Sequence, residues 1–461
     1  MLNVLLINPP AREASDEAIV VPPLGIAYLA AVARRVGHAV SIIDAFGEGL
    51  TWEGFASKVG RLKYDVIGLS GMTPVFDTVQ RAIPICRPQA RFLILGGPHA
   101  TAFRETILDD NPDLDFAVYG EGEQTFIELL DAIEKNCVTQ TIPGIIIREG
   151  IGPPRDLLDN LDELPFPARD LLPVERYRYP LSGDSRMTTI ISSRGCPFGC
   201  IFCDKGVFGS RWRARSAENV LAEVDEVVRK YGVKSIVFYD DLFTLKKDRL
   251  EKICKGLIKR KYPVKWKAEG RVDIIDEELL KLMRRAGCDT IAYGVESANQ
   301  KSLDYLGKKT TPDMAQSAFG KTRAAGIRTM GYFILGIPVE TYDEALKTIR
   351  FAKELNADFA QFSVLSPLPG TKLYREAKEK GWYHEVAAHS VADKDRLRPV
   401  VLSENWDEEK LISIVHRAHR EFYLRPSYIL KCLMRIQNMK ELRKYINLGG
   451  KMVNYVFGRS R

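Results

Sequence analysis

The chain has 461 residues, a length that suits two or three domains. Hydrophobic residues make up 45% and charged residues 28%, which excludes a collagen-like chain, a largely disordered chain and a small disulfide scaffold. The formal net charge is +7, and the segment from Ser427 onward, with eight Lys or Arg and one Glu, accounts for all of it. The neutral remainder gives no support to a nucleic-acid partner, so we expect none.

The N-terminal segment is apolar but resembles neither a signal peptide nor a membrane span. It lacks a basic region and a small-residue cleavage site. No apolar run in the chain reaches the ~18 residues that a spanning helix needs. We therefore expect a cytoplasmic protein, with the segment after Met1 forming a buried strand.

Residues 1–150 alternate short apolar runs with amphipathic stretches such as 24–35 and 124–134. The runs are rich in Val, Ile, Leu and Phe, and they cover 2–7, 39–43, 66–69, 92–95 and 116–119. Continuous apolar strands separated by helices are typical of a parallel sheet with both faces covered. The pattern predicts an α/β domain with a doubly wound parallel sheet, Rossmann-like or flavodoxin-like.

Glycine and small hydroxyl residues follow these strands, in the segments 70–74, 96–101 and 120–123. Ligands of such sheets bind outside the carboxyl ends of the strands, where small residues let a ligand approach the backbone. Simple turn chemistry would explain any one loop, but several at one edge favour a ligand site. No G-x-G-x-x-G follows the first strand and no Walker A loop occurs, so a dinucleotide is a weak candidate.

Residues 151–182 are rich in proline and predict an extended linker. A second alternating series follows. Its strand-like runs are 188–192, 235–239, 264–268, 290–294, 329–335 and 360–365, and its helices are roughly 217–230, 247–259, 276–285, 312–325, 342–355 and 373–380. Six such units predict a partial (β/α)6 TIM-type barrel over 183–382, with chemistry at the carboxyl ends of the strands.

Three of the eight cysteines, Cys196, Cys200 and Cys203, form a C-x3-C-x2-C cluster after the first strand of this series. Thiolates are soft ligands that suit zinc or iron–sulfur centres. A structural zinc ion takes four ligands, and no fourth Cys or His lies nearby. A 4Fe-4S cluster held by three thiolates leaves one iron open to a substrate, so we favour this cluster over zinc or inert cysteines.

This motif, at this place in a barrel, resembles the radical S-adenosylmethionine (SAM) superfamily. With the doubly wound first domain, residues 1 to 380 resemble its class with an N-terminal cobalamin-binding domain. That class includes hopanoid C-methylases and the anaerobic magnesium-protoporphyrin ester cyclase. The resemblance implies that the open iron binds SAM and that an electron cleaves it to methionine and a 5′-deoxyadenosyl radical. The radical takes a hydrogen atom from an unactivated carbon, and in methylating members methylcobalamin supplies the methyl group.

The resemblance also implies site residues. The cluster ligands are Cys196, Cys200 and Cys203, and Phe202 flanks the adenine. Asp240 and Asp241 match the position that receives the SAM amino group. Glu269 and Arg271 match polar SAM contacts, Glu296 and Ser297 match a ribose-binding motif, and 331–338 matches an adenine-contacting stretch. On the cobalamin side the matching residues are Ser70, Thr73, Gly96, Gly97, His99, Gly120 and Glu121. No catalytic residue is assigned.

The chain departs from some relatives of this class. It has no D-x-H-x-x-G motif, so no histidine is offered as a lower cobalt ligand, and the first domain is either a base-off cobalamin site or a vestigial one. Methylthiotransferases carry three further cysteines in the N-terminal domain, where this chain has only Cys86 and Cys137. This excludes that class and its tRNA substrate.

The sequence therefore predicts a radical SAM enzyme, with cobalamin-dependent C-methylation as the leading function. A radical SAM cyclase, ring-contraction or oxidative enzyme is the alternative. A cobalamin-binding redox sensor is the non-enzymatic alternative, which the SAM-site carboxylates disfavour. The partners expected are a small-molecule or lipid-like substrate and an external electron donor such as flavodoxin or ferredoxin.

Residues 383–461 predict a helical region, with a helix over 408–423 followed by a basic amphipathic tail. His416 and His419 lie three residues apart on that helix and are interpreted as part of a solvated face rather than as metal ligands. In the tail, Ile429 and Leu433 alternate with basic residues such as Lys431. Such a tail either binds anionic lipid at the inner face of a membrane or packs on the barrel with its charges outward.

Overall fold

The computed structural model describes residues 1–11, 20–61, 63–179, 185–387 and 397–434. These residues divide into two compact units. The first unit contains Met1–Pro197, Lys205–Ala268 and Arg285–Cys288. The second contains Phe198–Asp204, Glu269–Arg284 and the described residues from Asp289 onward.

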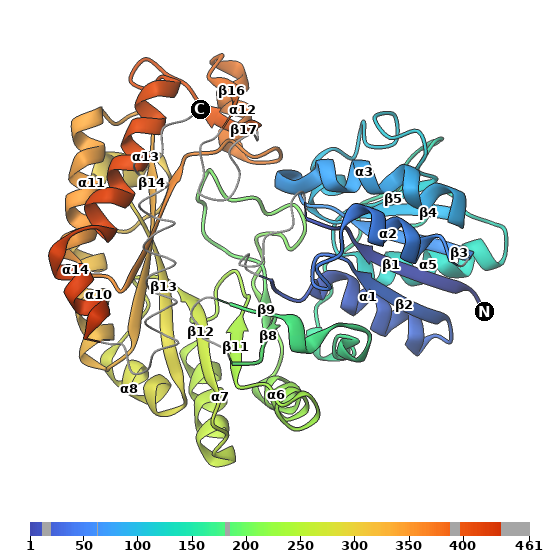
Figure 1. Ribbon diagram of the computed structural model, residues 1–461, viewed down its shortest axis with the longest axis horizontal. Helices are drawn as coiled ribbons and strands as arrows, with labels where there is room; N and C mark the ends of the chain where they lie inside the picture. The colour runs from blue at the N-terminus through green and yellow to red at the C-terminus, as the bar shows by residue number, and fades with distance from the viewer. Residues whose placement is uncertain (12–19, 62, 180–184, 388–396, 435–461) are drawn as a thin grey trace. The chain divides into compact units, whose positions relative to one another are not determined.

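The first unit is built on a seven-stranded sheet in the order β2-β1-β3-β4-β5-β6-β7 (Figure 1). The strands are β1 (Asn3–Asn8), β2 (Ala39–Asp44), β3 (Tyr64–Ser70), β4 (Ala90–Gly96), β5 (Phe116–Val118), β6 (Ile145–Ile147) and β7 (Gly150–Ile151). The first five strands pair in parallel, as the sequence predicts, and β6 and β7 add an antiparallel edge that it does not.

Helices cover both faces of this sheet because each carries one apolar stripe. On one face, α1 (Leu24–Arg35) and α5 (Gly122–Glu134) bury residues such as Ile26 and Leu129 in a single core. On the other face, α2 (Trp52–Val59) and α3 (Phe76–Cys86) bury residues such as Phe55 and Val79 in a second core. Two cores on two faces establish the doubly wound architecture.

The predicted linker is extended but packed. Over 152–179 it makes the short 3-10 turns η3 (Leu161–Glu163), η4 (Arg169–Leu171) and η5 (Val174–Arg176), and Arg178 forms an isolated antiparallel bridge with Val20. Ala168 and Leu172 join the core formed by α1 and α5, which also includes Met187 at the start of the barrel strands. The Tyr177 hydroxyl donates a hydrogen bond of 2.7 Å to Oδ2 of buried Asp44. The linker thus fastens the first barrel strand to the N-terminal sheet.

The barrel region forms a six-stranded parallel sheet in the order β15-β14-β13-β12-β11-β8. The strands are β8 (Met187–Ile190), β11 (Ser235–Phe238), β12 (Lys265–Gly270), β13 (Cys288–Glu296), β14 (Arg328–Leu335) and β15 (Phe359–Val364). The helices are α6 (Ala217–Tyr231), α7 (Lys247–Arg260), α8 (Glu277–Arg285), α9 (Gln300–Tyr305), α10 (Pro312–Ala324), α11 (Tyr342–Glu354) and α12 (Lys372–Glu379). All six predicted strand–helix units are present, and the short α9 is an addition.

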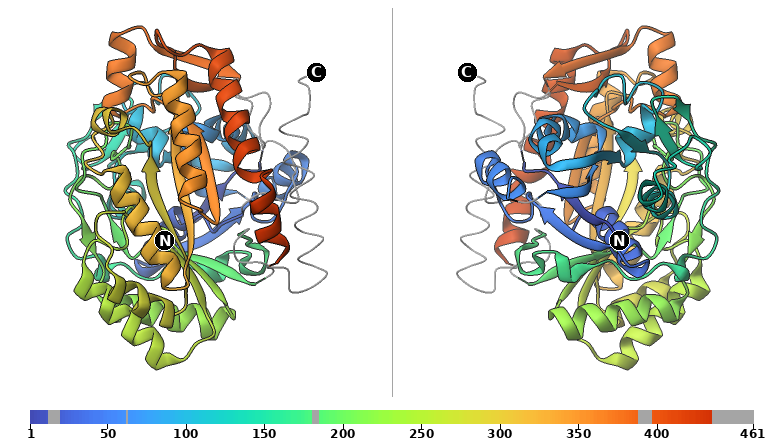
Figure 2. Two further views of the ribbon diagram at one scale, coloured as in Figure 1. Left: turned by 90° about the vertical axis from the view of Figure 1, so that its left-hand side faces the viewer. Right: turned by 90° about the vertical axis from the view of Figure 1, so that its right-hand side faces the viewer.

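The C-terminal region begins with an antiparallel pair that the sequence did not predict, β16 (Tyr383–Ala387) and β17 (Leu397–Val401). The predicted helix follows as α13 (Glu408–Tyr423), which packs against α11 and β15 (Figure 2). The last described helix is α14 (Pro426–Leu433). Over the residues that can be described, no helix combines the length and apolar character needed to cross a membrane.

His419 corrects one interpretation of this region. Its ring is largely buried against Phe362 and Tyr423, and Nδ1 lies 2.9 Å from the carbonyl oxygen of Val415. Burial lowers its pKa. The face of α13 that carries His419 therefore packs on β15 instead of meeting solvent.

Candidate active site

The three cysteines lie in a loop that closes on itself. The loop starts from β9 (Ser193–Arg194), just after β8, and ends at β10 (Arg213–Ala214), which pairs antiparallel with β9. Gly195 adopts a φ of +83°, and a Cβ there would lie 2.3 Å from the carbonyl oxygen of Arg211. Only glycine fits this position, so the sharp turn into the cysteine motif depends on the glycine at residue 195.

Within the second unit, Cys200 and Cys203 lie next to one another. A hydrogen bond from the Cys203 thiol lowers the pKa of Cys200, helped by the positive charges of Lys308 and Arg271, and the same bond raises the pKa of Cys203. Cys196 belongs to the first unit. In the described parts of the chain, no group of three His, Cys, Asp or Glu side chains is arranged so that it could hold a metal ion. The donor chemistry fits an iron–sulfur cluster, because thiolates are its ligands and Cys200 is already favoured as one.

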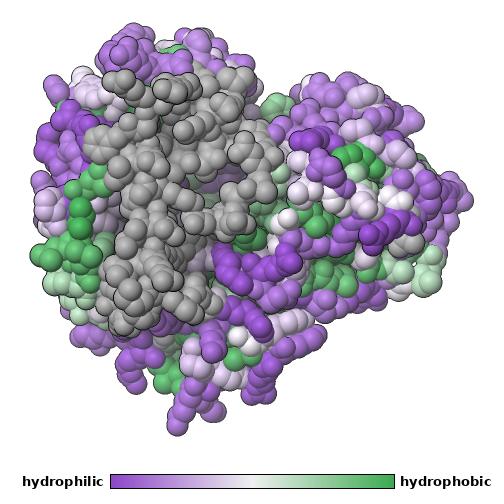
Figure 3. Space-filling view, viewed as in Figure 1, coloured by the Kyte–Doolittle hydropathy of each residue, from purple (hydrophilic) through white to green (hydrophobic). Residues whose placement is uncertain are grey.

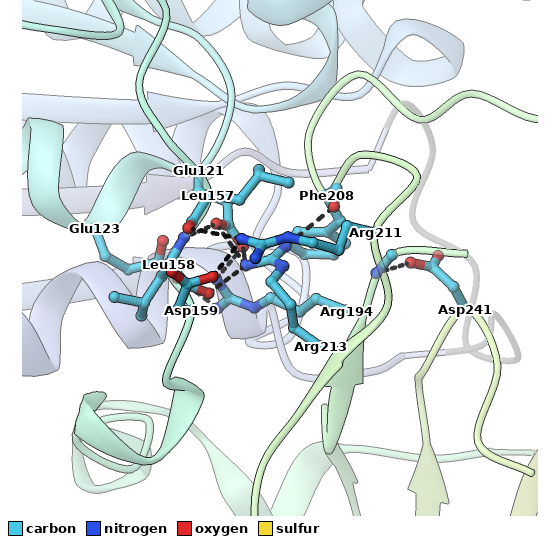
Figure 4. A network of polar contacts seen from close by, with 11 residues as sticks. Glu121, Glu123, Leu157, Leu158, Asp159, Arg194, Phe208, Arg211, Arg213 and Asp241 are labelled. Atoms are coloured by element: carbon cyan, nitrogen blue, oxygen red, sulfur yellow. Dashed lines mark hydrogen bonds and ion pairs between the residues drawn. The ribbon is translucent and has the colours of Figure 1, made fainter. Parts of the chain in front are cut away.

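Asp240 and Asp241 follow β11, at the edge where the cysteine loop begins. Asp240 is buried, and its two oxygens accept hydrogen bonds of 2.6 Å from the Ser192 amide and from the hydroxyls of Ser192 and Ser193. Asp241 is exposed, and its Oδ2 accepts from the Gly195 amide at 2.8 Å (Figure 4). Asp240 therefore organises the start of the cysteine loop, while Asp241 keeps the exposed carboxylate that an ammonium group requires.

A buried ion pair follows the fourth barrel strand. Lys308 Nζ lies 2.6 Å from Glu296 Oε1, with side-chain exposures of 10% and 7%. Gly294 makes room for it, since a Cβ at this residue would lie 2.4 Å from Glu296 Oε1 and 2.5 Å from Lys308 Nζ. The sequence reasoning missed Lys308, because the segment Gly307–Lys309 has the composition of an exposed turn. Only the structure shows that this lysine is buried beside a predicted site residue.

Arg271 and Glu269 lie at the end of β12. The Arg271 guanidinium stacks 3.5 Å above the Phe198 ring and donates to both oxygens of Asp273 at 3.0 Å. Glu269 Oε1 accepts from the Tyr332 hydroxyl at 3.1 Å. The structure thus holds both polar side chains in place from within the second unit, and their contact with SAM stays a prediction.

Ser297 and Phe202 have contrasting surroundings. The Ser297 hydroxyl is fully buried, accepts from the Asn299 amide at 3.1 Å and lies 3.2 Å from Thr348 Oγ1. Its observed role is to shape the turn after Glu296. Phe202 is partly buried and packs in the core that includes Ile334 and Ile337, residues of the predicted adenine-contacting stretch.

At the N-terminal sheet, most of the predicted cobalamin residues meet at the carboxyl edge. Ser70 pairs with Gly96 across β3 and β4. Gly97 adopts a φ of +98°, where a Cβ would lie 2.9 Å from both the Gly71 carbonyl and Ser70 Oγ. Thr101 connects the loop after β4 to the loop after β5. Its hydroxyl donates a hydrogen bond to Gly97 O at 3.0 Å and accepts one from the Gly120 amide at 3.1 Å.

His99 is held between two aromatic rings at this edge, in the short helix α4 (Pro98–Ala102). Its ring lies parallel to Phe76 at 3.5 Å and near Phe103 at 4.5 Å. Nδ1 lies 3.2 Å from the Thr73 hydroxyl. Burial lowers its pKa to about 4, so the imidazole is neutral at physiological pH. His99 is therefore a tightly packed, uncharged side chain at the carboxyl edge of the N-terminal sheet.

Glu121 differs from the other predicted cobalamin residues. Its carboxylate is buried and receives Arg194 and Arg213, the residues that flank the cysteine loop (Figure 4). Both carboxylate oxygens therefore already form ion pairs with arginine side chains of the chain itself. A direct contact of this side chain with cobalamin stays a prediction.

A cysteine loop after the first strand of a six-stranded partial barrel is the arrangement of enzymes that generate radicals from SAM. Comparison with known proteins agrees with this class. Residues 190–352 match the Radical SAM superfamily model, and residues 18–130 match the B12 binding domain model. The expected cofactors, a 4Fe-4S cluster, SAM and cobalamin, are those of the two matched families.

An uncharacterized methyltransferase of Pyrococcus horikoshii is 34% identical over 445 residues, which cover 94% of each chain. The present chain belongs to the radical SAM superfamily, in the class with an N-terminal B12-binding domain. The anaerobic magnesium-protoporphyrin IX monomethyl ester cyclase of Rubrivivax gelatinosus is 28% identical, covering 100% of this chain and 88% of its own. The radical SAM methyltransferase TsrM of Kitasatospora setae, solved with cobalamin and a [4Fe-4S] cluster, shares the fold at a TM-score of 0.74 and 18% identity, covering 92% of this chain and 89% of its own.

Proposed function

We propose that this protein is a cobalamin-dependent radical SAM methyltransferase that methylates an unactivated carbon of a small-molecule or lipid-like substrate. One structural observation carries the proposal: the B12-binding sheet and the start of the barrel, including Cys196, fold as one compact unit. That unit shares a continuous core and the Glu121 ion pairs. A domain joined in this way to the cysteine loop is built to act together with it.

When bound, the cluster and SAM supply a 5′-deoxyadenosyl radical, and cobalamin supplies a methyl carrier. The chain's own residues bind and orient these groups. Cys196, Cys200 and Cys203 hold the cluster. Asp241 receives the SAM ammonium group, because a carboxylate forms strong charge-assisted hydrogen bonds with it.

Glu296 and Lys308 present a fixed pair of opposite charges beside the cysteines in the second unit, and they orient the polar end or the ribose of SAM. At the other cofactor, the small residues Ser70, Gly97 and Gly120 let the corrin approach the backbone. Neutral His99, packed between two aromatic rings, contributes a flat surface there.

The named relatives support methyl transfer over the alternatives. The Pyrococcus relative, which spans the same length, is named a methyltransferase, while the Rubrivivax relative is named a cyclase. A cyclase or oxidative enzyme is therefore the second candidate. A redox sensor without SAM chemistry has no use for the exposed Asp241 or for the Glu296–Lys308 pair.

Anaerobic reconstitution tests the proposal. The protein is loaded with iron, sulfide and hydroxocobalamin, desalted, and examined by ultraviolet–visible spectroscopy. Retained corrin bands together with an iron–sulfur absorption shoulder support methyl transfer. The shoulder without corrin would contradict it and favour the cyclase or oxidative reaction.

The reaction needs a one-electron donor, and we propose a flavodoxin or ferredoxin for this role. Replacing dithionite with reduced flavodoxin in a SAM-cleavage assay tests it. Turnover is expected with the protein donor. No 5′-deoxyadenosine from either donor class would contradict the assignment.

We also propose that α14 makes peripheral contact with anionic membrane lipid. On its inner side Tyr428 is buried and Lys431 Nζ lies 3.0 Å from Asp358 Oδ1. Its outer side is apolar, with exposures of 45% to 73% at Ile429, Leu430, Leu433 and Met434, visible where α14 lies in Figure 3. The sequence beyond Leu433 is strongly basic, which complements an anionic surface.

Sedimentation with anionic vesicles at low salt tests this contact. The native chain is expected in the pellet, and Leu430→Asp with Leu433→Asp in the supernatant. Val36→Asp is the control, because Val36 is 48% exposed on the first unit. A native chain that stays wholly in the supernatant would refute the contact.

A further inference from the structure

Arg194 and Arg213 stand at the two ends of the cysteine loop, residues 195–212, and both bind one carboxylate. Arg194 Nη1 lies 2.9 Å from Glu121 Oε1, and Arg213 Nη1 lies 2.9 Å from Glu121 Oε2. The three side chains are 3% to 6% exposed. Together with Glu123, whose Oε1 lies 2.6 Å from Arg194 Nη2, they form what we call the Glu121 network (Figure 4).

The network also contacts the interior of the cysteine loop, at Phe208, and the linker, at Leu158. Arg213 Nη2 donates to the Phe208 carbonyl at 3.0 Å, and the Arg194 guanidinium lies 4.9 Å from the Phe208 ring centre. The Leu158 amide donates to Glu121 Oε2 at 3.0 Å, while Arg213 Nη1 donates to the Leu158 carbonyl at 2.7 Å. Every residue of the network belongs to the first unit.

Glu121 itself is placed by the N-terminal sheet. It follows Gly120 at the carboxyl end of β5 and is the N-cap residue of α5. Gly120 is bonded through Thr101 to the loop after β4. A shift of this ligand-binding edge would therefore move the carboxylate that both arginines share.

The buried ion pairs of the Glu121 network make it costly to move any one of its side chains. Two buried guanidinium groups face two carboxylates, so removing one carboxylate leaves a buried positive charge without its partner. Burial opposes ionisation of Glu123, yet Arg194 outweighs it and holds the pKa of Glu123 below its usual value. Arg–carboxylate pairs of this kind fix direction as well as distance.

We infer that Glu121 is a positioning residue for the iron–sulfur cluster, which fixes the two ends of the cysteine loop to the carboxyl edge of the B12-binding sheet. It acts through Arg194 and Arg213 and touches neither cofactor. The cobalamin side of this inference rests on the proposed function, whereas the fixing of the cysteine loop does not.

The test compares Glu121→Gln with Glu128→Gln in the full-length reconstituted protein. Glu128 lies on the same helix and pairs with Arg155, a linker residue outside the network, so it controls for losing one carboxylate. Hydrogen–deuterium exchange of 195–212 is measured without cobalamin. We expect Glu121→Gln to speed exchange there roughly 10-fold or more, since it loses charge-assisted hydrogen bonds to both arginines, and Glu128→Gln to leave it unchanged.

The second readout is the midpoint potential of the cluster. Glu121→Gln leaves one positive charge uncompensated beside the loop, because Glu123 still pairs with Arg194, and this charge favours the reduced cluster, so the potential is expected to shift upward. Glu128→Gln should not shift it. Should Glu121→Gln fail to fold, Arg213→Lys keeps the charge but loses the forked geometry, and the same rise in exchange is expected.

Unchanged exchange and potential in both network variants would overturn the positioning role. Failure of the proposed function has a different signature. In that case hydroxocobalamin gives no protection of 96–101 in the native chain, although the network variants still differ from the control in the cysteine loop.

Discussion

A single methyl group at Gly294 tests the geometry of the Glu296–Lys308 pair. In Gly294→Ala the new Cβ would lie 2.4 Å from Glu296 Oε1 and 2.5 Å from Lys308 Nζ. Glycine to alanine in a strand ordinarily stabilises by roughly 0.5–1 kcal/mol. Here the ends of both side chains must shift away from the new methyl group, and a buried charge-assisted hydrogen bond is worth about 1.5–3 kcal/mol, so distorting it opposes the gain.

Because 1.4 kcal/mol corresponds to a tenfold change in affinity, we expect SAM to bind Gly294→Ala roughly 10- to 100-fold more weakly. Equilibrium dialysis of SAM against the reconstituted protein measures this. Gly320→Ala is the matched control, because a Cβ there meets nothing within 4 Å and the helix α10 should gain stability. Native SAM affinity and melting temperature in Gly294→Ala would refute the placement of the pair in the SAM site.

Two further predictions concern buried charge and pH. Glu223 is fully buried between Arg169, at 2.6 Å, and Arg215, so Glu223→Gln should cost about 3–5 kcal/mol in chemical denaturation. Burial opposes ionisation of Glu223, but the two arginines keep its pKa below 4.5. Its contribution is therefore present above pH 4.5 and lost as pH falls through the folded pKa, and native and variant stabilities should converge in acid. For His99, whose pKa falls from 6.5 to about 4 on folding, native stability should drop as pH falls from 6.5 to 4, and His99→Phe should lack this slope in urea titrations. If the stability of a variant and of the native chain changed with pH in parallel, the pKa shift assigned to Glu223 or His99 would be contradicted.

The fold could be predicted because hydrophobic periodicity is local. Runs such as 66–69 and 290–294 specify buried strands wherever they occur, and the structure extends them only by a few residues at their ends. The strands β16 and β17 could not be predicted in this way, because each is short and their antiparallel pairing depends on contacts between separate segments.

The site could be predicted only in part. Cysteine spacing is local and specific, so the cluster motif was visible in the sequence. Glu121 shows the limit: an acidic residue in a glycine-rich loop suggests a ligand contact, but its arginine partners lie 73 and 92 residues away. Lys308 shows the converse, since its burial beside Glu296 depends on packing that no local pattern encodes.

The most direct test of the account is the fate of SAM. The protein reconstituted with iron and sulfide is incubated anaerobically with SAM and dithionite, with and without hydroxocobalamin, and the nucleoside products are quantified. The account predicts 5′-deoxyadenosine in both reactions and S-adenosylhomocysteine only with cobalamin, the second product marking transfer of the SAM methyl group. 5′-Deoxyadenosine alone in both reactions would contradict methyl transfer, and intact SAM would contradict the radical chemistry itself.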